Sequence, residues 1–136
     1  MTIVVGYIPT PEGLAAVDRA IERAQSAGQR LVIVNTGHLG NTAHPHYASE
    51  KDLDALVGRL TEMGIEHEVR QQESAVNAAE EILGAAKDTA ADLIVIGVRR
   101  RSPVGKLVTG STAQAVLLEA QCDVLAVKAS ATAPEA

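Results

Sequence analysis

Continuous apolar runs of strand length alternate along the chain with stretches in which apolar residues recur every three or four positions. Such runs are typical of strands covered on both faces, and the longer spacing is typical of helices. Runs at 2–7, 31–34, 93–96 and 123–128 predict four strands. A fifth strand, half-exposed and at a sheet edge, is predicted at 65–70, where uncharged and charged residues alternate.

The first helix has clear start and stop signals. Thr10 followed by Pro11 predicts its N-terminus, because proline at the first helical position loses no hydrogen bond. Gly28 predicts its C-terminus. The residues expected to face inward are Leu14, Val17, Ile21 and Ala24.

Three further helices are predicted, over about 49–63, 74–86 and 111–120. The elements then follow the order β-α-β-α-β-α-β-α-β in one domain at 1–128. Buried strands that alternate with helices predict a parallel sheet with right-handed crossovers. The low-complexity tail at 129–136 is expected to be disordered.

The segment at 97–111 is the strongest candidate for chemistry, since ligands of such sheets bind beyond the carboxyl ends of the strands. It holds no acidic residue and four of the twelve basic ones, namely Arg99, Arg100, Arg101 and Lys106. The remaining eight basic and seventeen acidic residues give −9, against −5 for the whole chain. Residues 110–112 open a helix whose free N–H groups and positive dipole end suit a phosphate. A solvated connection with an ordinary N-cap is the open alternative.

The composition excludes several other classes of function. Aromatic residues make up 1% of the chain, and its net charge is −5, so neither base stacking nor a broad phosphate-binding surface is available for nucleic acid. Cys122 is the only cysteine, which excludes an intramolecular disulfide and a multi-cysteine zinc site. No apolar run approaches the ~18 residues of a membrane span, and no signal peptide is recognisable, so a cytoplasmic protein is expected.

Catalytic and metal-binding patterns are missing as well. No Ser-His-Asp order, paired-carboxylate motif or HExxH helix can be assembled, so no catalytic residue is predicted. His38, His44 and His46 crowd one loop without a carboxylate or cysteine among them, and no metal site is predicted there. The sequence gives catalysis no positive support.

Residues 93–128, the five-strand order and the IVVGY opening together resemble the universal stress protein (UspA-like) family over about residues 2–128. The most specific part is the pattern Gly-x2-Gly-x9-Gly-Ser/Thr at the fourth strand. Here it begins at Gly97, has Arg100 at the second glycine and ends at Gly110-Ser111.

The resemblance implies a flavodoxin-like three-layer α/β sandwich with strand order 3-2-1-4-5. It implies a stress-response regulator or sensor that binds ATP, AMP or another adenine nucleotide or phosphate, with at most nucleotide-bound magnesium and at most weak ATP hydrolysis. The site it implies lies between the first and fourth strands. Its expected residues are Ile8, Val34, Ile96, Gly97, Gly110, Ser111 and Thr112. The sequence itself adds Arg99, Arg100 and Arg101 for their charge, and Tyr7 for its place at the end of the first strand, where an ordinary buried tyrosine is the open alternative.

Within that set, Gly97 and residues 110–112 are expected to hold phosphate and ribose, and Val34 and Ile96 to flank adenine. Two residues depart from the family pattern. Ile8 stands where ATP-binding members carry an acidic residue, which weakens nucleoside recognition. Arg100 replaces a glycine and adds a positive fork that suits a phosphate.

The resemblance also implies a homodimer formed by antiparallel pairing of the last strand, 123–128, whose exposed edge would otherwise be unprotected. The alternative function is a ligand-independent dimeric interaction module, in which the basic loop at 97–111 docks on an acidic protein surface. An enzyme of the wider nucleotide-binding α-hydrolase-like class that turns over an adenylated or phosphorylated substrate is a third.

Overall fold

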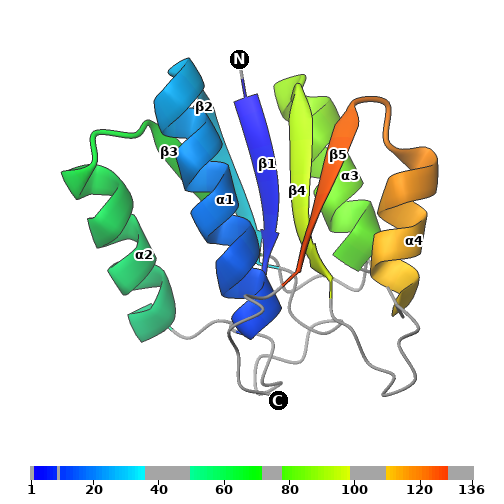
Figure 1. Ribbon diagram of the computed structural model, residues 1–136, viewed down its shortest axis with the longest axis horizontal. Coiled ribbons are helices and arrows are strands. Elements are labelled where there is room, and N and C mark those ends of the chain that lie inside the picture. Colours follow the sequence, from blue (N-terminus) through cyan, green and yellow to red (C-terminus); the bar gives the residue numbers. More distant parts are fainter. Residues whose placement is uncertain (1, 9, 36–49, 72–77, 99–109, 129–136) are drawn as a thin grey trace.

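Five parallel strands form the centre of the molecule in the order β3-β2-β1-β4-β5 (Figure 1). The computed structural model describes residues 2–8, 10–35, 50–71, 78–98 and 110–128. The strands are β1 (Thr2–Tyr7), β2 (Arg30–Asn35), β3 (His67–Gln71), β4 (Leu93–Val98) and β5 (Asp123–Lys128). The helices are α1 (Pro11–Ala27), α2 (Glu50–Glu62), α3 (Ala78–Thr89) and α4 (Gly110–Glu119). The predicted element order, strand order and flavodoxin-like fold class are confirmed.

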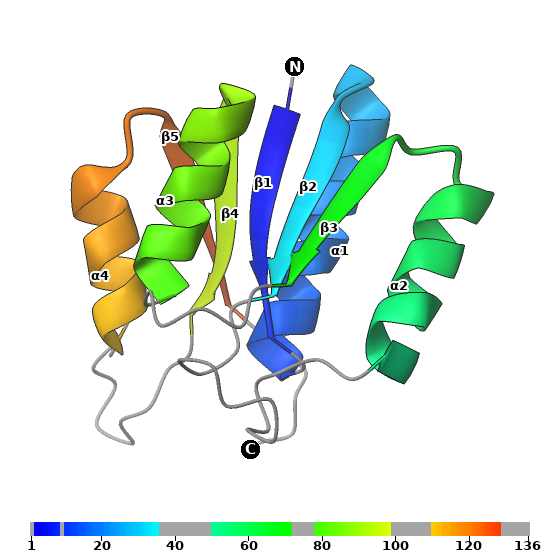
Figure 2. The ribbon, with the colours of Figure 1, turned by 180° about the vertical axis from the view of Figure 1, so that it is seen from behind.

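Helices cover both faces of the sheet, so the molecule has three layers (Figures 1 and 2). Alternate residues of β1 divide the core between the two faces: Ile3 and Val5 pack with α1 and α2, whereas Val4 packs with α3 and α4. Both cores consist almost entirely of aliphatic side chains and alanine. Small side chains of this kind allow helices to pack closely on the sheet, in agreement with the scarcity of aromatic residues.

The predicted ends of α1 are confirmed. The hydroxyl of Thr10 accepts a hydrogen bond from the N–H of Gly13 at 3.1 Å, and Gly28 ends the helix in the left-handed conformation with φ 64°. The prediction that Leu14 faces inward is wrong, because this residue is 49% exposed. The first turn directs Glu12 and Gly13 toward the sheet, which leaves Leu14 one position further round the helix.

The edge strand β3 begins two residues later than predicted. Ile65 is buried, but its N–H donates to the carbonyl of Leu60 at 3.1 Å, so it closes the end of α2. The predicted half-exposed edge is otherwise confirmed, since all five residues of β3 are of intermediate exposure. Residue 49 and residues 74–77, where two of the helices were predicted to begin, lie outside the described residues, as does the tail at 129–136.

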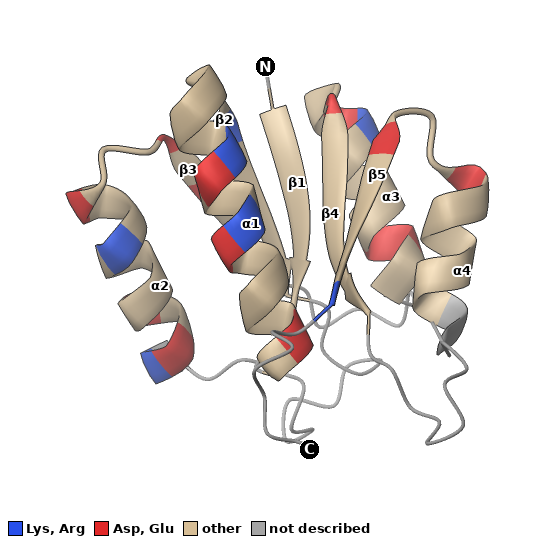
Figure 3. Cartoon of the chain, in the orientation of Figure 1, with Lys and Arg blue, Asp and Glu red and all other residues tan. Residues whose placement is uncertain are grey.

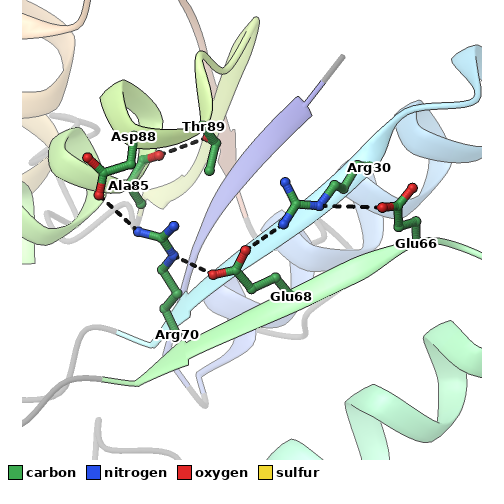
Figure 4. Close-up of polar contacts among 7 residues, drawn as sticks. All are labelled: Arg30, Glu66, Glu68, Arg70, Ala85, Asp88 and Thr89. Carbon is green, nitrogen blue, oxygen red and sulfur yellow. Dashed lines mark hydrogen bonds and ion pairs between the residues drawn. The ribbon is translucent and has the colours of Figure 1, made fainter.

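A chain of ion pairs ties β3 to β2 and α3 (Figure 4). Glu68 accepts from Arg30 at 2.5 Å and from Arg70 at 2.7 Å, and Arg70 also reaches Asp88 of α3 at 3.3 Å. These ion pairs balance the charges of side chains on a face of β3 that is only partly buried. Within the described ranges, no helix has the length and apolar character needed to cross a bilayer.

Candidate functional site

The carboxyl ends of the strands and the N-termini of the helices lie at one edge of the sheet (Figure 1). The strand order reverses between β1 and β4, because β2 and β3 extend the sheet on one side of β1 while β4 and β5 extend it on the other. Parallel α/β sheets bind ligands at such a point. The first turns of α1 and α4 begin at this edge, where the helix dipoles place partial positive charge.

Most of the predicted site residues meet at this edge. Tyr7 ends β1 and Ile8 follows it, Val34 lies near the end of β2, and Ile96 and Gly97 lie near the end of β4. The backbone of Gly110, Ser111 and Thr112 forms the first turn of α4. Arg99, Arg100 and Arg101 lie outside the described residues, so their expected role remains a prediction.

Val34 and Ile96, the residues expected to flank adenine, lie on either side of Gly6 of β1. Gly6 pairs with Val34 in the β1–β2 register, and a methyl group added at Gly6 would lie 3.7 Å from Cγ2 of Ile96. Both flanking side chains are buried, with exposed fractions of 2% and 4%. The space above Gly6 is occupied by Ile82 of α3, whose Cδ1 would lie 2.8 Å from that added methyl.

Gly97 has a packing role of its own. A methyl group there would lie 2.6 Å from the carbonyl carbon of Glu12 and closer still to its oxygen. The backbone of the first turn of α1 therefore rests directly on β4. Glycine at position 97 allows the N-terminus of α1 to reach the switch point between β1 and β4.

Ile8 lies in a tight connection between β1 and α1. Its carbonyl accepts a hydrogen bond from the N–H of Thr10 at 2.8 Å, and a side chain at Gly13 would collide with that same carbonyl. This geometry fixes where α1 begins. The side chain of Ile8 is partly exposed at the edge of the sheet and presents no hydrogen-bonding group.

Two hydrogen bonds join the ends of β1, β2 and β3, and sequence reasoning named Tyr7 but missed Asn35 and Gln71. Tyr7, Asn35 and Gln71 lie in register across the three strands. The buried amide of Asn35 donates to the carbonyl of Tyr7 at 2.9 Å and accepts from Gln71 at 2.8 Å. Burial, and then the charge of Asp52, raise the pKa of the Tyr7 phenol. The available signal was that each of these strands ends in a hydrogen-bonding side chain.

Arg70 and Lys128 lie near the same edge at the ends of β3 and β5. Arg70 is in register with Val34, but Glu68 and Asp88 already balance its charge. Lys128 ends β5 in register with Val98, and its side chain is exposed. Lys128 therefore adds a positive charge beside the start of the basic loop. Sequence reasoning assigned it only to the dimer strand. Elsewhere basic and acidic residues are interspersed along the outer faces of α1 and α2 (Figure 3).

Glu81, in the first turn of α3, is the most perturbed carboxyl group among the described residues whose pKa is resolved. Partial burial raises its pKa to about 7. The side chain of Glu81 is of intermediate exposure. Helix α3 packs against the sheet through Ile82 and Ala85, which draws the neighbouring Glu81 out of water.

The N-termini of α1 and α4 supply partial positive potential at this edge, which is favourable for an anion. Among the residues with a described position, no three His, Cys, Asp or Glu side chains converge as metal ligands. His38, His44 and His46 lie outside the described residues.

Sequence comparison identifies relatives over nearly the whole chain. A model of the universal stress protein family matches residues 1–128. A universal stress protein from Mycolicibacterium smegmatis is 40% identical over 126 residues, which cover 93% of this chain and 96% of the relative.

Structural comparison gives the same family. A universal stress protein from Archaeoglobus fulgidus has a TM-score of 0.75 and 28% identity, covering 94% of this chain and 98% of its own. A universal stress protein solved in complex with cAMP has a TM-score of 0.70 and 25% identity, covering 96% of this chain and 98% of its own.

Proposed function

The chain belongs to the universal stress protein family, and on that premise we propose that it binds an adenine nucleotide or another phosphate ligand at the carboxyl edge of its sheet. In this proposal the protein is a regulator or sensor of a stress response, and ligand occupancy is its signal. The observation that carries the proposal is that β1 and β4 end, and α4 begins, at the same edge of the sheet (Figure 1). The cAMP complex of a relative supports the choice of an adenine nucleotide.

The proposal assigns different tasks to different residues. The N–H groups at 110–112 and the positive end of the α4 dipole hold phosphate oxygens. Arg99, Arg100 and Arg101 supply the charge, and arginine can bind a phosphate through two parallel hydrogen bonds. Gly97 acts by letting α1 approach, so that the first turns of α1 and α4 both face the ligand. Ile8 offers no hydrogen bond to the nucleoside, which makes the phosphates the main source of affinity.

Isothermal titration calorimetry with ATP, AMP, cAMP and inorganic phosphate tests the proposal. At a protein concentration of about 0.1 mM, a dissociation constant in the micromolar range gives a measurable heat. The proposal predicts saturable binding of at least one nucleotide. Absence of heat with every ligand would contradict it and favour the ligand-independent interaction module.

A matched pair of triple variants tests the assignment of the arginines. Replacing Arg99, Arg100 and Arg101 with glutamine should weaken ATP binding at least about tenfold, since each loses a phosphate contact. Replacing Arg19, Arg23 and Arg59 with glutamine gives the same net charge but removes exposed arginines of α1 and α2. The control should bind ATP within about twofold of the wild type. Equal losses in both variants would show that only overall charge matters.

We also propose that two copies associate through β5, which forms the edge of the sheet next to β4. Antiparallel pairing of two β5 strands places Asp123 of one copy opposite Lys128 of the partner subunit, so the opposite charges at the two ends of the strand become complementary. Helix α4 precedes β5 and carries Leu117 and Leu118, exposed by 46% and 84%, which add apolar surface beside that edge.

Charge exchange tests the dimer. Sedimentation equilibrium should show a several-fold weaker dimer for Asp123→Lys and for Lys128→Asp, because each single change makes two like-charge pairs. The double variant should recover most of the wild-type association. Wild-type protein that stays monomeric at about 0.1 mM, or a double variant as weak as the sum of the singles, would contradict this geometry.

A further inference from the structure

We propose that Asn35 is a positioning residue of the ligand site: its buried amide orients the Tyr7–Ile8 peptide so that the N–H of Ile8 faces the carboxyl edge between β1 and β4 and donates to a phosphate oxygen. The inference rests on the proposed function, since it concerns a ligand at the same edge. It adds a backbone donor at a position where the side chain offers no hydrogen bond.

The direction of this peptide follows from one hydrogen bond. The carbonyl of Tyr7 accepts from Nδ2 of Asn35 at 2.9 Å, and the two residues are in register across β1 and β2, so the carbonyl points toward β2. The peptide bond is trans, which makes its N–H point the opposite way. Because β4 lies on the other side of β1, the N–H of Ile8 faces β4.

The pairing of β1 with β4 ends before it reaches this N–H. The last pair in the β1–β4 register is Val5 with Val95, whereas β1 pairs with β2 as far as Tyr7 and Asn35. Ile8 lies beyond both registers, at the edge of the sheet where α4 also begins (Figure 1). The N–H of Ile8 is therefore not part of the β1–β4 register and is placed to meet an anion there.

Asn35 selects one of two orientations of the Tyr7–Ile8 peptide. The chain is anchored on either side of this peptide, because the Tyr7 side chain is buried and the carbonyl of Ile8 accepts from the N–H of Thr10 at 2.8 Å. Rotation of the peptide plane between these anchors would exchange the N–H and the carbonyl. A carbonyl oxygen would then face the ligand and repel its phosphate. The amide of Asn35 opposes that rotation, since a donor in this place needs an acceptor opposite it.

Gln71 fixes which end of the Asn35 amide faces Tyr7. Its Nε2 donates to Oδ1 of Asn35 at 2.8 Å, which directs Nδ2 of Asn35 to the carbonyl of Tyr7. Asn35 is 0% exposed, and hydrogen bonds at both ends hold its buried side chain in one orientation. Gln71 is only partly buried, so a substitution there can disturb this orientation without placing a new group in the core.

Two uncharged substitutions test the inference, Asn35→Leu and Gln71→Met. Calorimetric titration should show affinities for ATP and for inorganic triphosphate that fall together, about tenfold in Asn35→Leu and about threefold in Gln71→Met. Nuclear magnetic resonance of the free variants should show shifted signals for the carbonyl carbon of Tyr7 and the amide of Ile8, which report the orientation of the peptide. Thermal unfolding confirms that each variant is folded, and Gln71→Met alone suffices if Asn35→Leu does not fold.

Gln29→Met is the matched control. Gln29 is also a partly buried glutamine whose Nε2 donates to a side chain, in this case Asp92 at 3.3 Å, but both residues lie at the opposite edge of the sheet. The substitution removes the same donor and adds the same side chain as Gln71→Met. Its affinity for both ligands should stay within about twofold of the wild type.

The outcomes separate this inference from the proposed function. Wild-type protein that binds neither ligand would contradict the function, and this inference with it. When the wild type binds, affinities within about twofold of it in every folded variant of Asn35 and Gln71 would overturn the inference and leave the function intact. The inference is equally wrong if Gln29→Met loses as much affinity as Gln71→Met, if ATP loses affinity and triphosphate does not, or if the signals of Tyr7 and Ile8 stay unchanged.

Discussion

Gly97→Ala should destabilise the protein severely, although it adds only one methyl group. That methyl would lie 2.6 Å from the carbonyl carbon of Glu12 and closer to its oxygen, and both atoms belong to the backbone of a helix. A flexible side chain could rotate away, whereas the first turn of α1 must shift as a unit. Overpacking of this kind costs about 3 kcal/mol, the upper part of the usual range, because the obstacle is backbone.

This loss is a large part of the ~5–15 kcal/mol by which domains are stable. With an m-value of about 1.5 kcal/mol/M, the urea midpoint should fall by about 2 M. Far-UV circular dichroism is the suitable probe, because the chain has no tryptophan.

Gly84→Ala is the matched control, since a methyl group at this position in α3 meets nothing within 4 Å. It should stabilise the protein by about 0.5–1 kcal/mol, as alanine favours the helix over glycine. A Gly97→Ala variant within about 0.5 kcal/mol of wild type would refute the close approach of α1 and β4 on which the site geometry rests.

Three further substitutions have defined outcomes. Ala90→Gly should raise the free energy of unfolding by about 0.5–1 kcal/mol, measured by urea titration, because Ala90 ends α3 with a left-handed φ of 52°. The pKa of Glu81 is raised to about 7, so its contribution to stability is complete at acidic pH and declines as the pH rises through 7. Glu81→Gln should therefore raise the melting temperature at pH 8 and have little effect at pH 4. Hydrogen bonding from Arg70 lowers the pKa of Glu68, so its contribution is present at neutral pH and is lost as the pH falls through the lowered value. Glu68→Gln should lower the melting temperature at pH 7, and the two melting curves should converge in acid.

Strands buried on both faces were the most predictable elements of the fold. The run 31–34 contains no polar residue. A strand without polar residues must be covered on both faces, which places it in the middle layer of the fold. The ends of α1 were predictable for a local reason, since Thr10 and Gly28 act on backbone groups within four residues of themselves.

The inward face of α1 was less predictable, because the sequence period does not fix the rotation of a helix. The close approach of Glu12 to Gly97 sets that rotation, and it turns Leu14 outward. Such a contact joins residues far apart in the chain. The sequence also does not show whether a glycine in a motif makes room for a ligand or for a neighbouring helix.

The candidate site, like the fold, was only partly predictable from the sequence. Tyr7, Val34, Ile96 and Gly97 could be placed at one edge because parallel strands end together. The bridge from Tyr7 through Asn35 to Gln71 depends on the register of three strands, which no local pattern contains. Nor could the sequence indicate that Ile82 packs over Gly6, because that contact joins a helix and a strand far apart in the chain.

Amide chemical-shift mapping of the isotopically labelled protein with ATP tests the central claim most directly, because it reports both binding and place. The account predicts saturable shifts at the carboxyl edge, in the N–H groups of Tyr7, Gly97 and residues 110–112. The opposite edge of the sheet, including Gly28 and Asp92, should be unaffected. An unchanged spectrum at millimolar ATP, or shifts confined to the opposite edge, would contradict the account.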